Sequence, residues 1–226
     1  MTPSFPHIQS AIVDLDGTMI DTVGDFTAAL NLTLSDLRLA AAVDAADVAL
    51  LVGKGSEHLL RSVLRQLGAP ADLYAPAAEA YQRHYLAVNG RHATVYPGVV
   101  EGLQLLRARG LRLACLTNKP SAFARPLLRD KGLHMYFDHV FGGDAFARKK
   151  PDPLPLRKTC EALDTAPART LMIGDSSNDA RAARAAGCPV LLVTYGYNHG
   201  EPIQGVDADG FLGSIAQVGA WLESAG

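Results

Sequence analysis

The chain has 226 residues, of which 48% are hydrophobic and 19% charged, and its formal net charge is −2. This composition is typical of a soluble globular protein with one large domain or two smaller ones. It shows neither an apolar run long enough for a membrane span nor the basic footprint of a nucleic-acid-binding protein, so we expect neither partner.

The start of the chain and its cysteines indicate the compartment. Residues 1–6 lack the basic start and the apolar stretch of a secretory signal, so we expect a cytoplasmic protein. Cys115, Cys160 and Cys188 are widely spaced in apolar surroundings. This pattern favours small buried core residues over disulfides or zinc ligands.

The first predicted element is a buried strand within residues 8–17, an apolar run that closes on Asp14, Asp16 and Gly17. The carboxyl end of such a strand is where α/β sheets place their ligand crevices. Strand periodicity directs both carboxylates to one face, and their repulsion favours a hard cation such as Mg²⁺. Asp14 could then attack an electrophile while Asp16 exchanges a proton with the leaving group and with water. A turn with capping aspartates is the structural alternative.

The next stretch, residues 21–91, is predicted to be entirely helical. It contains amphipathic segments and no strand candidate. The expected helices are Asp25–Leu39, Ser56–Leu67 and Leu73–Val88.

A basic loop with glycines on both sides lies within this helical stretch. Lys54 stands between Gly53 and Gly55, directly before the helix expected at Ser56. Lys54 could reach an anionic group of a substrate. In the alternative interpretation the glycines only end one helix and Ser56 caps the next.

From about residue 93 onward, strands alternate with helices, which predicts a parallel sheet with helices on both faces. Gly110, Gly132 and Gly187 each follow a helical pattern and precede a strand, as C-cap glycines do. The expected core elements are residues 8–17, 95–110, a strand ending at Thr117, residues 139–141, a strand ending at Gly174, and residues 190–194.

Polar residues follow the strands of this second part. Thr117 and Asn118 could donate to phosphate oxygens, although such residues also cap helices. Lys150 could neutralise a phosphoryl group, or it could lie in a solvated basic turn. Asp175 would complete a metal site, and Asp179, one helical turn later, could hold Lys150 or a metal-bound water. A plain helix N-terminus is the alternative for these two acids.

The string Asp14-Leu-Asp16-Gly-Thr18 resembles the first motif of the haloacid dehalogenase-like phosphohydrolases, and the three remaining motifs follow in the order of that superfamily. The resemblance implies that Asp14 becomes an aspartyl-phosphate and that Asp16 is the general acid and base. Catalysis would also use Lys150, and the phosphate would be bound by Thr117, Asn118 and Lys150. The implied Mg²⁺ ligands are Asp14, Asp16 and Asp175, with Asp179 supporting them.

A helical insertion between the first and second motifs resembles the cap of one subclass of these enzymes. It implies a Rossmann-like α/β core made of residues 1–20 and 92–226, with an all-α cap at residues 21–91. Such a cap excludes water during phosphoryl transfer and reopens for product release. Residues 194–203 and the loop around Lys54 further resemble bacterial phosphoglycolate phosphatases, and this similarity covers nearly the whole chain.

The resemblance therefore implies a Mg²⁺-dependent phosphatase for a small phosphate monoester, with 2-phosphoglycolate as the first choice. We expect a small-molecule ester as the partner and a monomer or small homo-oligomer. The alternatives are a phosphatase for another small metabolite or sugar phosphate, and a sugar phosphomutase on the same core. A phospho-accepting signalling module is the non-enzymatic alternative, but such a receiver needs no helical insertion after its first strand.

Overall fold

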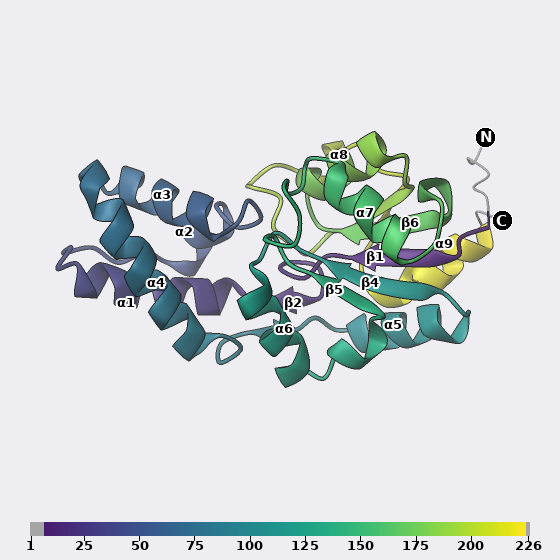
Figure 1. Ribbon diagram of the computed structural model, residues 1–226, viewed down its shortest axis with the longest axis horizontal. Helices are drawn as coiled ribbons and strands as arrows, with labels where there is room; N and C mark the ends of the chain where they lie inside the picture. The colour runs from purple at the N-terminus through teal and green to yellow at the C-terminus, as the bar shows by residue number, and fades with distance from the viewer. Residues whose placement is uncertain (1–6, 225–226) are drawn as a thin grey trace.

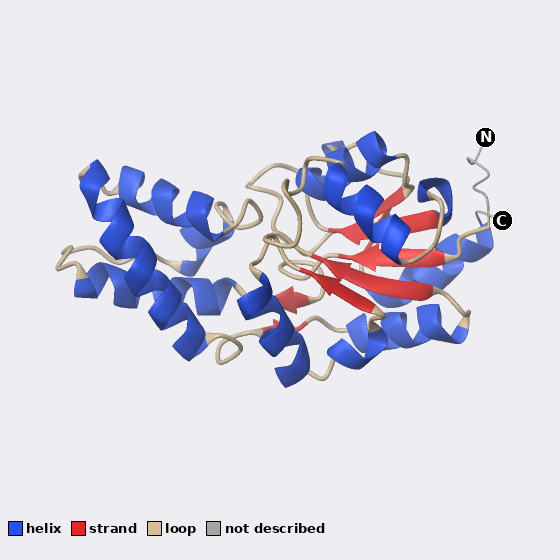
Figure 2. Cartoon of the chain, in the orientation of Figure 1, coloured by secondary structure: helices blue, strands red, loops and turns tan. Residues whose placement is uncertain are grey.

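A computed structural model describes residues 7–224 of the chain. In this range six strands form one sheet: β1 (Ser10–Val13), β4 (Arg112–Leu116), β5 (His139–Phe141), β6 (Thr170–Gly174), β7 (Val190–Val193) and β8 (Gly210–Leu212). All neighbours pair in parallel, in the order β5-β4-β1-β6-β7-β8 (Figure 2). The predicted fold class is confirmed. The edge strand β8 was not expected, since it is short and begins with glycine.

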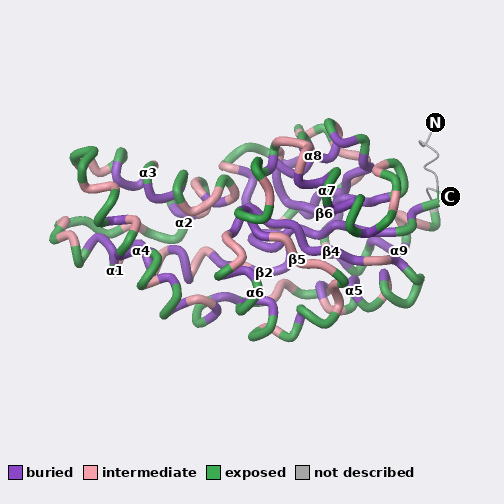
Figure 3. Tube along the Cα trace, viewed as in Figure 1, coloured by how far each residue is buried: buried purple, intermediate pink, exposed green. Residues whose placement is uncertain are grey.

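Helices cover both faces of this sheet (Figure 1). One face carries α5 (Val99–Ala108), α6 (Ser121–Asp130) and α9 (Val218–Ser224), and the other carries α7 (Leu154–Ala162) and α8 (Ser177–Ala186). In β1, Ala11 and Val13 pack with the first set of helices, whereas Ile12 packs with the second. Because successive strand side chains point to opposite faces, a strand covered on both sides must be apolar throughout. The burial of the strands follows from this (Figure 3).

A second group of helices lies beyond one end of the sheet (Figure 1). We call this group the helical layer; it consists of α1 (Val23–Asp36), α2 (Ala45–Ala49), α3 (Ser56–Gln66) and α4 (Tyr74–Val88). The helices bury a hydrophobic cluster of their own, in which Leu30, Leu60 and Tyr85 are fully covered. The three expected helices are present with slightly shifted ends. The short helix α2 was not predicted because it is too short to show helical periodicity.

Two short antiparallel strands, β2 (Ile20–Asp21) and β3 (Thr94–Val95), connect the helical layer to the sheet. Tyr197, in the loop after β7, contacts the start of α1 beside them. Its phenolic oxygen accepts hydrogen bonds from the backbone N–H groups of Thr22 at 3.0 Å and Val23 at 3.2 Å. The division into a core and a cap at residues 20 and 91 stays a prediction. Residues 1–6 and 225–226, which that division includes, lie outside the described range.

Smaller features complete the fold. Short 3-10 turns occur at Ala71–Leu73, His134–Tyr136, Pro167–Arg169, Ile203–Gly205 and Ile215–Gln217. The three cysteines are free and buried, as predicted. None of the helices within residues 7–224 combines the length and apolarity that a membrane span requires.

The packing of α5 provides a test of this architecture. A Cβ added to Gly102 would lie 2.5 Å from Ile215 Cγ2 and 2.7 Å from the Ile215 carbonyl carbon. Alanine is favoured over glycine in a helix by about 1 kcal/mol, but a clash with backbone cannot be relieved by a change of rotamer. We expect Gly102→Ala to lower the free energy of unfolding by about 1–3 kcal/mol in urea titrations followed by circular dichroism.

Gly205→Ala is the control for this substitution, because an added Cβ would meet nothing within 4 Å. We expect it to change the free energy of unfolding by less than about 0.5 kcal/mol. Equal stability of the two variants would contradict the close contact between α5 and Ile215.

Candidate active site

The carboxyl ends of β4, β1 and β6, which are neighbours in the sheet, carry polar side chains. Asp14 follows β1, Thr117 follows β4 and Asp175 follows β6. All three residues are buried. The carboxyl ends of parallel strands meet at one edge of a sheet, and here this edge faces the helical layer (Figure 1).

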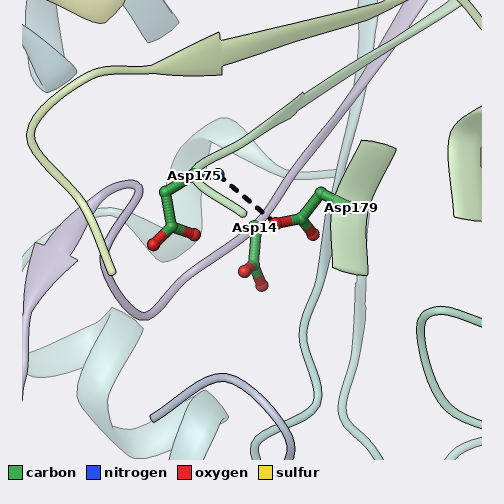
Figure 4. A group of neighbouring side chains, drawn as sticks. All are labelled: Asp14, Asp175 and Asp179. Carbon is green, nitrogen blue, oxygen red and sulfur yellow. Dashed lines mark hydrogen bonds between the residues drawn. The ribbon is translucent and has the colours of Figure 1, made fainter. Parts of the chain in front are cut away.

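Asp14, Asp175 and Asp179 form an acidic cluster (Figure 4). One carboxylate oxygen from each lies within 4.8 Å of the others. Burial raises the pKa of Asp14 to about 7, with Asp179 and Asp16 adding to the rise and Lys150 opposing it. Burial, and then the charges of Asp179 and Asp14, also raise the pKa of Asp175 well above its ordinary value. The raised pKa values mean that the charged forms of Asp14 and Asp175 are poorly stabilised in this buried cluster.

Lys150 supplies part of the missing charge. Its ammonium nitrogen lies 2.7 Å from Asp179 Oδ1 and 2.8 Å from Asp14 Oδ1, and it donates to the Leu116 carbonyl at 2.9 Å. Burial alone would lower the pKa of Lys150, but the Asp14 and Asp179 carboxylates outweigh it and hold the pKa above its usual range. Lys150 is thus a fixed cation beside Asp14.

The Asp14 carboxylate itself is incompletely satisfied. Its Oδ1 forms an ion pair with the Lys150 ammonium, which also pairs with Asp179. One shared ammonium does not offset the charges of two buried carboxylates. Together with the oxygen-only donor set of the cluster, this fits a hard divalent cation.

Asp179 organises the loop that carries Asp175. The residues form a capping box at the start of α8, as the Ser176-x-x-Asp179 spacing allows. Asp179 Oδ2 accepts from the Ser176 hydroxyl at 2.8 Å and from the Ser176 backbone N–H at 3.2 Å. It also accepts from the Asp175 backbone N–H at 3.3 Å (Figure 4). Because Asp179 Oδ1 also pairs with Lys150, the Asp179 side chain connects the loop that carries Asp175 to the motif that contains Lys150.

The side chain of Asp16 does not join the acidic cluster in the structure. Asp16 Oδ1 accepts from Thr22 Oγ1 at 2.7 Å and from Lys119 Nζ at 2.8 Å. We expected Asp14 and Asp16 to share a face and one cation, but each pairs with its own lysine. The reason is local: β1 ends at Val13 and the chain turns at Gly17, where φ is +80°, so strand alternation does not continue to Asp16. The role of Asp16 as a metal ligand stays a prediction.

Lys119 is a site residue that the sequence analysis did not single out. It is buried, and besides its pairing with Asp16 its ammonium lies 4.3 Å from the Phe26 ring centroid and 4.8 Å from that of Tyr85. Its position directly after Thr117 and Asn118 was the available signal. Periodicity does not show where the side chain of a loop residue points.

Thr117 and Asn118 lie at the predicted edge but have different bonding. Thr117 Oγ1 accepts from the Lys119 N–H at 3.1 Å, and among residues 7–224 the Thr117 hydroxyl donates to no acceptor. Asn118 Nδ2 donates to the carbonyls of Gly53 at 3.0 Å and Lys150 at 2.9 Å, and Asn118 Oδ1 accepts from the Lys150 N–H at 3.0 Å. Asn118 therefore fixes the backbone of Lys150 and joins it to the helical layer.

A cavity lies between the sheet edge and the helical layer. Asp14, Asp16 and Thr117 line it, and so do Gly53 and Gly55. Lys54, between the two glycines, is exposed and is not among the lining residues. The charge of Lys54 acts on His199 instead, whose pKa is lowered first by burial and then by Lys54.

Comparison with known proteins identifies relatives along almost the whole chain. Residues 8–187 match the family of haloacid dehalogenase-like hydrolases. The phosphoglycolate phosphatase of Thiobacillus denitrificans is 42% identical over 98% of this chain and 99% of its own length. The plasmid phosphoglycolate phosphatase of Cupriavidus necator is 43% identical over 96% of this chain and 94% of its own length.

Solved structures share the fold. A predicted phosphoglycolate phosphatase from Haemophilus somnus 129pt superimposes with a TM-score of 0.89 at 29% identity, over 95% of this chain and 97% of its own. CbbY from Rhodobacter sphaeroides, in complex with phosphate, gives a TM-score of 0.81 at 27% identity, over 96% of this chain and 99% of its own.

The acidic cluster predicts an unusual effect on stability. In the metal-free protein the folded state keeps a proton on Asp14 up to a pH of about 7, whereas the ordinary pKa is 3.8. The stability of the wild type therefore falls as the pH rises between these two values. Asp14→Asn removes that loss. We expect the variant to be more stable than the wild type near pH 8 by a few kcal/mol, since one pKa unit corresponds to about 1.4 kcal/mol.

The measurement is urea unfolding in the presence of EDTA. The difference between the two proteins should shrink as the pH is lowered from about 7 and disappear only below 3.8, where Asp14 is protonated in the unfolded chain as well. The exposed Asp72 supplies the control Asp72→Asn, for which we expect no such pH-dependent difference. A less stable Asp14→Asn protein near pH 8 would show that Lys150 more than compensates the repulsion.

Proposed function

The chain belongs to the haloacid dehalogenase-like hydrolase family, and from its site we propose that it is a Mg²⁺-dependent phosphatase that hydrolyses 2-phosphoglycolate to glycolate and phosphate. The observation that carries this proposal is the buried Asp14, held beside Lys150 and next to Asp175, at the sheet edge. The full-length similarity to proteins named phosphoglycolate phosphatase supports the choice of substrate.

The donor set supports magnesium as the cofactor. Asp14 and Asp175 would hold the ion through their carboxylates and Asp16 through its main-chain carbonyl, with Asp179 keeping the Asp175 loop in place. When bound, Mg²⁺ offsets the charge of the phosphoryl oxygens. Lys150 adds a positive charge 2.8 Å from Asp14 Oδ1.

Asp14 is the proposed nucleophile. One of its carboxylate oxygens forms a bond to phosphorus as the bond between phosphorus and the ester oxygen breaks, which leaves an aspartyl-phosphate. The ammonium of Lys150 and the free hydroxyl proton of Thr117 stabilise the charge on the transferring group. Asn118 contributes indirectly, because it holds the Lys150 backbone.

Asp16 is the proposed general acid and base. It lines the same cavity as Asp14, and Thr22 and Lys119 fix its Oδ1. In the first step Asp16 gives its proton to the departing alkoxide. In the second it takes a proton from water as the water oxygen attacks phosphorus, and the bond between phosphorus and Asp14 breaks.

Residues 21–91 form the proposed cap over this site. The cap closes the cavity and excludes bulk water from the reacting groups. The proposed setting is the cytoplasm, with a small phosphate ester as the partner, without nucleic acid or membrane, and with the protein as a monomer or small homo-oligomer.

The test of the proposed function is phosphate release from a panel of phosphorylated metabolites, with Mg²⁺ and with EDTA. We expect 2-phosphoglycolate to be the best substrate and EDTA to abolish turnover. We expect Asp14→Asn to reduce kcat to less than about a tenth of the wild-type value, because the amide is nearly isosteric but not nucleophilic. A variant that retains more than this, or a wild type that forms an isomer and no phosphate, would contradict the proposal.

Asp16→Asn separates the proton-transfer role from phosphoryl binding. We expect kcat for 2-phosphoglycolate to fall by about 10²- to 10⁴-fold, the range for general acid–base catalysis. Binding of Mg²⁺, measured by calorimetry, should persist, since the main-chain carbonyl is unchanged. A small loss of kcat would mean that another residue supplies the proton.

A further inference from the structure

The part of the cavity wall that comes from the helices is aromatic. Phe26 of α1, Tyr81 and Tyr85 of α4, and Phe123 of α6 line it. The Tyr85 ring stacks on Phe26 at 5.2 Å and on Tyr81 at 5.6 Å between centroids, and it meets Phe123 edge-on at 4.8 Å. These mutual contacts hold the rings in place, and they therefore also fix the positions of the Tyr81 and Tyr85 hydroxyl groups.

Two of these rings carry buried hydroxyl groups without a partner. Tyr81 is 2% exposed and Tyr85 is 1% exposed, and neither phenolic oxygen has a hydrogen-bond partner among residues 7–224. Burial raises the pKa of both phenols well above the ordinary value, so both remain protonated at neutral pH. A buried donor that finds no acceptor costs about 1–3 kcal/mol. Two such groups in one cavity wall indicate that the acceptor is a ligand.

Lys119 places a positive charge in the same wall. Its ammonium lies 4.3 Å from the Phe26 ring centroid and 4.8 Å from that of Tyr85. Within the described part of the chain, Asp16 is its one hydrogen-bond acceptor. An ammonium has three N–H donors, so two are left. The wall therefore offers two hydroxyl donors and a cation. The complementary ligand group is negatively charged and has several acceptor positions.

We propose that Tyr81, Tyr85 and Lys119 bind the carboxylate of a small phosphorylated acid whose phosphoryl group lies at Asp14. The proposal rests on the proposed function, which supplies the phosphate ester, and it names the residues that select an acid as the leaving group. A carboxylate offers about four acceptor positions, enough for the free donors of this wall. Lys54, which in one of the two interpretations of its loop would contact an anionic group of the substrate, is exposed outside the cavity.

The experiment compares two ligands that cannot be hydrolysed. In 3-phosphonopropionate a CH₂ group replaces the ester oxygen of 2-phosphoglycolate, and propylphosphonate has a methyl group in place of the carboxylate. Binding of each to the Mg²⁺-loaded protein is measured by calorimetry. The ratio of the two dissociation constants gives the preference for a carboxylate.

We expect the wild type to prefer 3-phosphonopropionate. Tyr81→Phe and Tyr85→Phe, which remove only the hydroxyls, should each reduce that preference by about tenfold or more, the effect of a hydrogen bond to a charged group. The dissociation constant of propylphosphonate should not change. Tyr74→Phe is the matched control on the same helix: the Tyr74 ring stacks with Arg61 and is not part of this cavity, so the preference should stay at the wild-type value. Lys119 is not replaced, because its loss would leave Asp16 without its cation.

Three results would overturn the inference. The tyrosine variants could keep the wild-type preference, they could lose affinity equally for both ligands, or Lys54→Ala could abolish the preference while they retain it. The readout is independent of turnover. A wild type that binds 3-phosphonopropionate preferentially but releases no phosphate from any ester would contradict the proposed function and leave the carboxylate site standing.

Discussion

The repulsion among buried carboxylates is the constraint on which the rest of the site depends. Asp14, Asp16, Asp175 and Asp179 all lie at one edge of the sheet and are all buried. Two buried lysines oppose them, Lys150 on Asp14 and Asp179, and Lys119 on Asp16. When all four of these carboxyl groups are ionised, they exceed the two lysines by two negative charges, which is the charge that one divalent cation offsets. The acids and lysines come from different loops, so this charge balance holds only when the loops after β1, β4 and β6 are held close together.

The fold meets this constraint with rigid strands and close backbone contacts. Strands covered by helices on both faces cannot shift without exposing apolar surface, so their carboxyl ends are fixed points. The turn after β1 approaches the Asp175 side chain so closely that a Cβ at Gly17 would lie 2.2 Å from Asp175 Oδ2. Only glycine tolerates both that distance and the positive φ there. The capping box of α8 then orients Asp179 by the same bonds that start the helix.

The sequence predicted the sheet and the position of the acids along the chain, because apolar strand runs and the residues that end them are local patterns. It did not predict the direction of Asp16, since alternation stops where the strand stops. Nor did it single out Lys119, Tyr81 and Tyr85. The two tyrosines are spaced four apart on α4 and look like part of an ordinary apolar helix face. Only the tertiary structure shows that both residues line a cavity shared with Asp14 and that their hydroxyls have no hydrogen-bond partner among residues 7–224.

The loop after β7 is bonded both to the sheet edge and to the start of the helical layer. The hydroxyl oxygen of Tyr197 accepts from the first backbone N–H groups of α1 and contacts Asp21, while the backbone N–H of Tyr197 donates to Asp175 Oδ2 at 2.6 Å. One residue is therefore bonded both to an acid of the sheet edge and to the base of the helical layer. A rotation of α1 about its first turn would therefore pull on the Tyr197 hydroxyl. Because the backbone N–H of the same residue is bonded to Asp175, that displacement would reach a carboxylate of the acidic cluster.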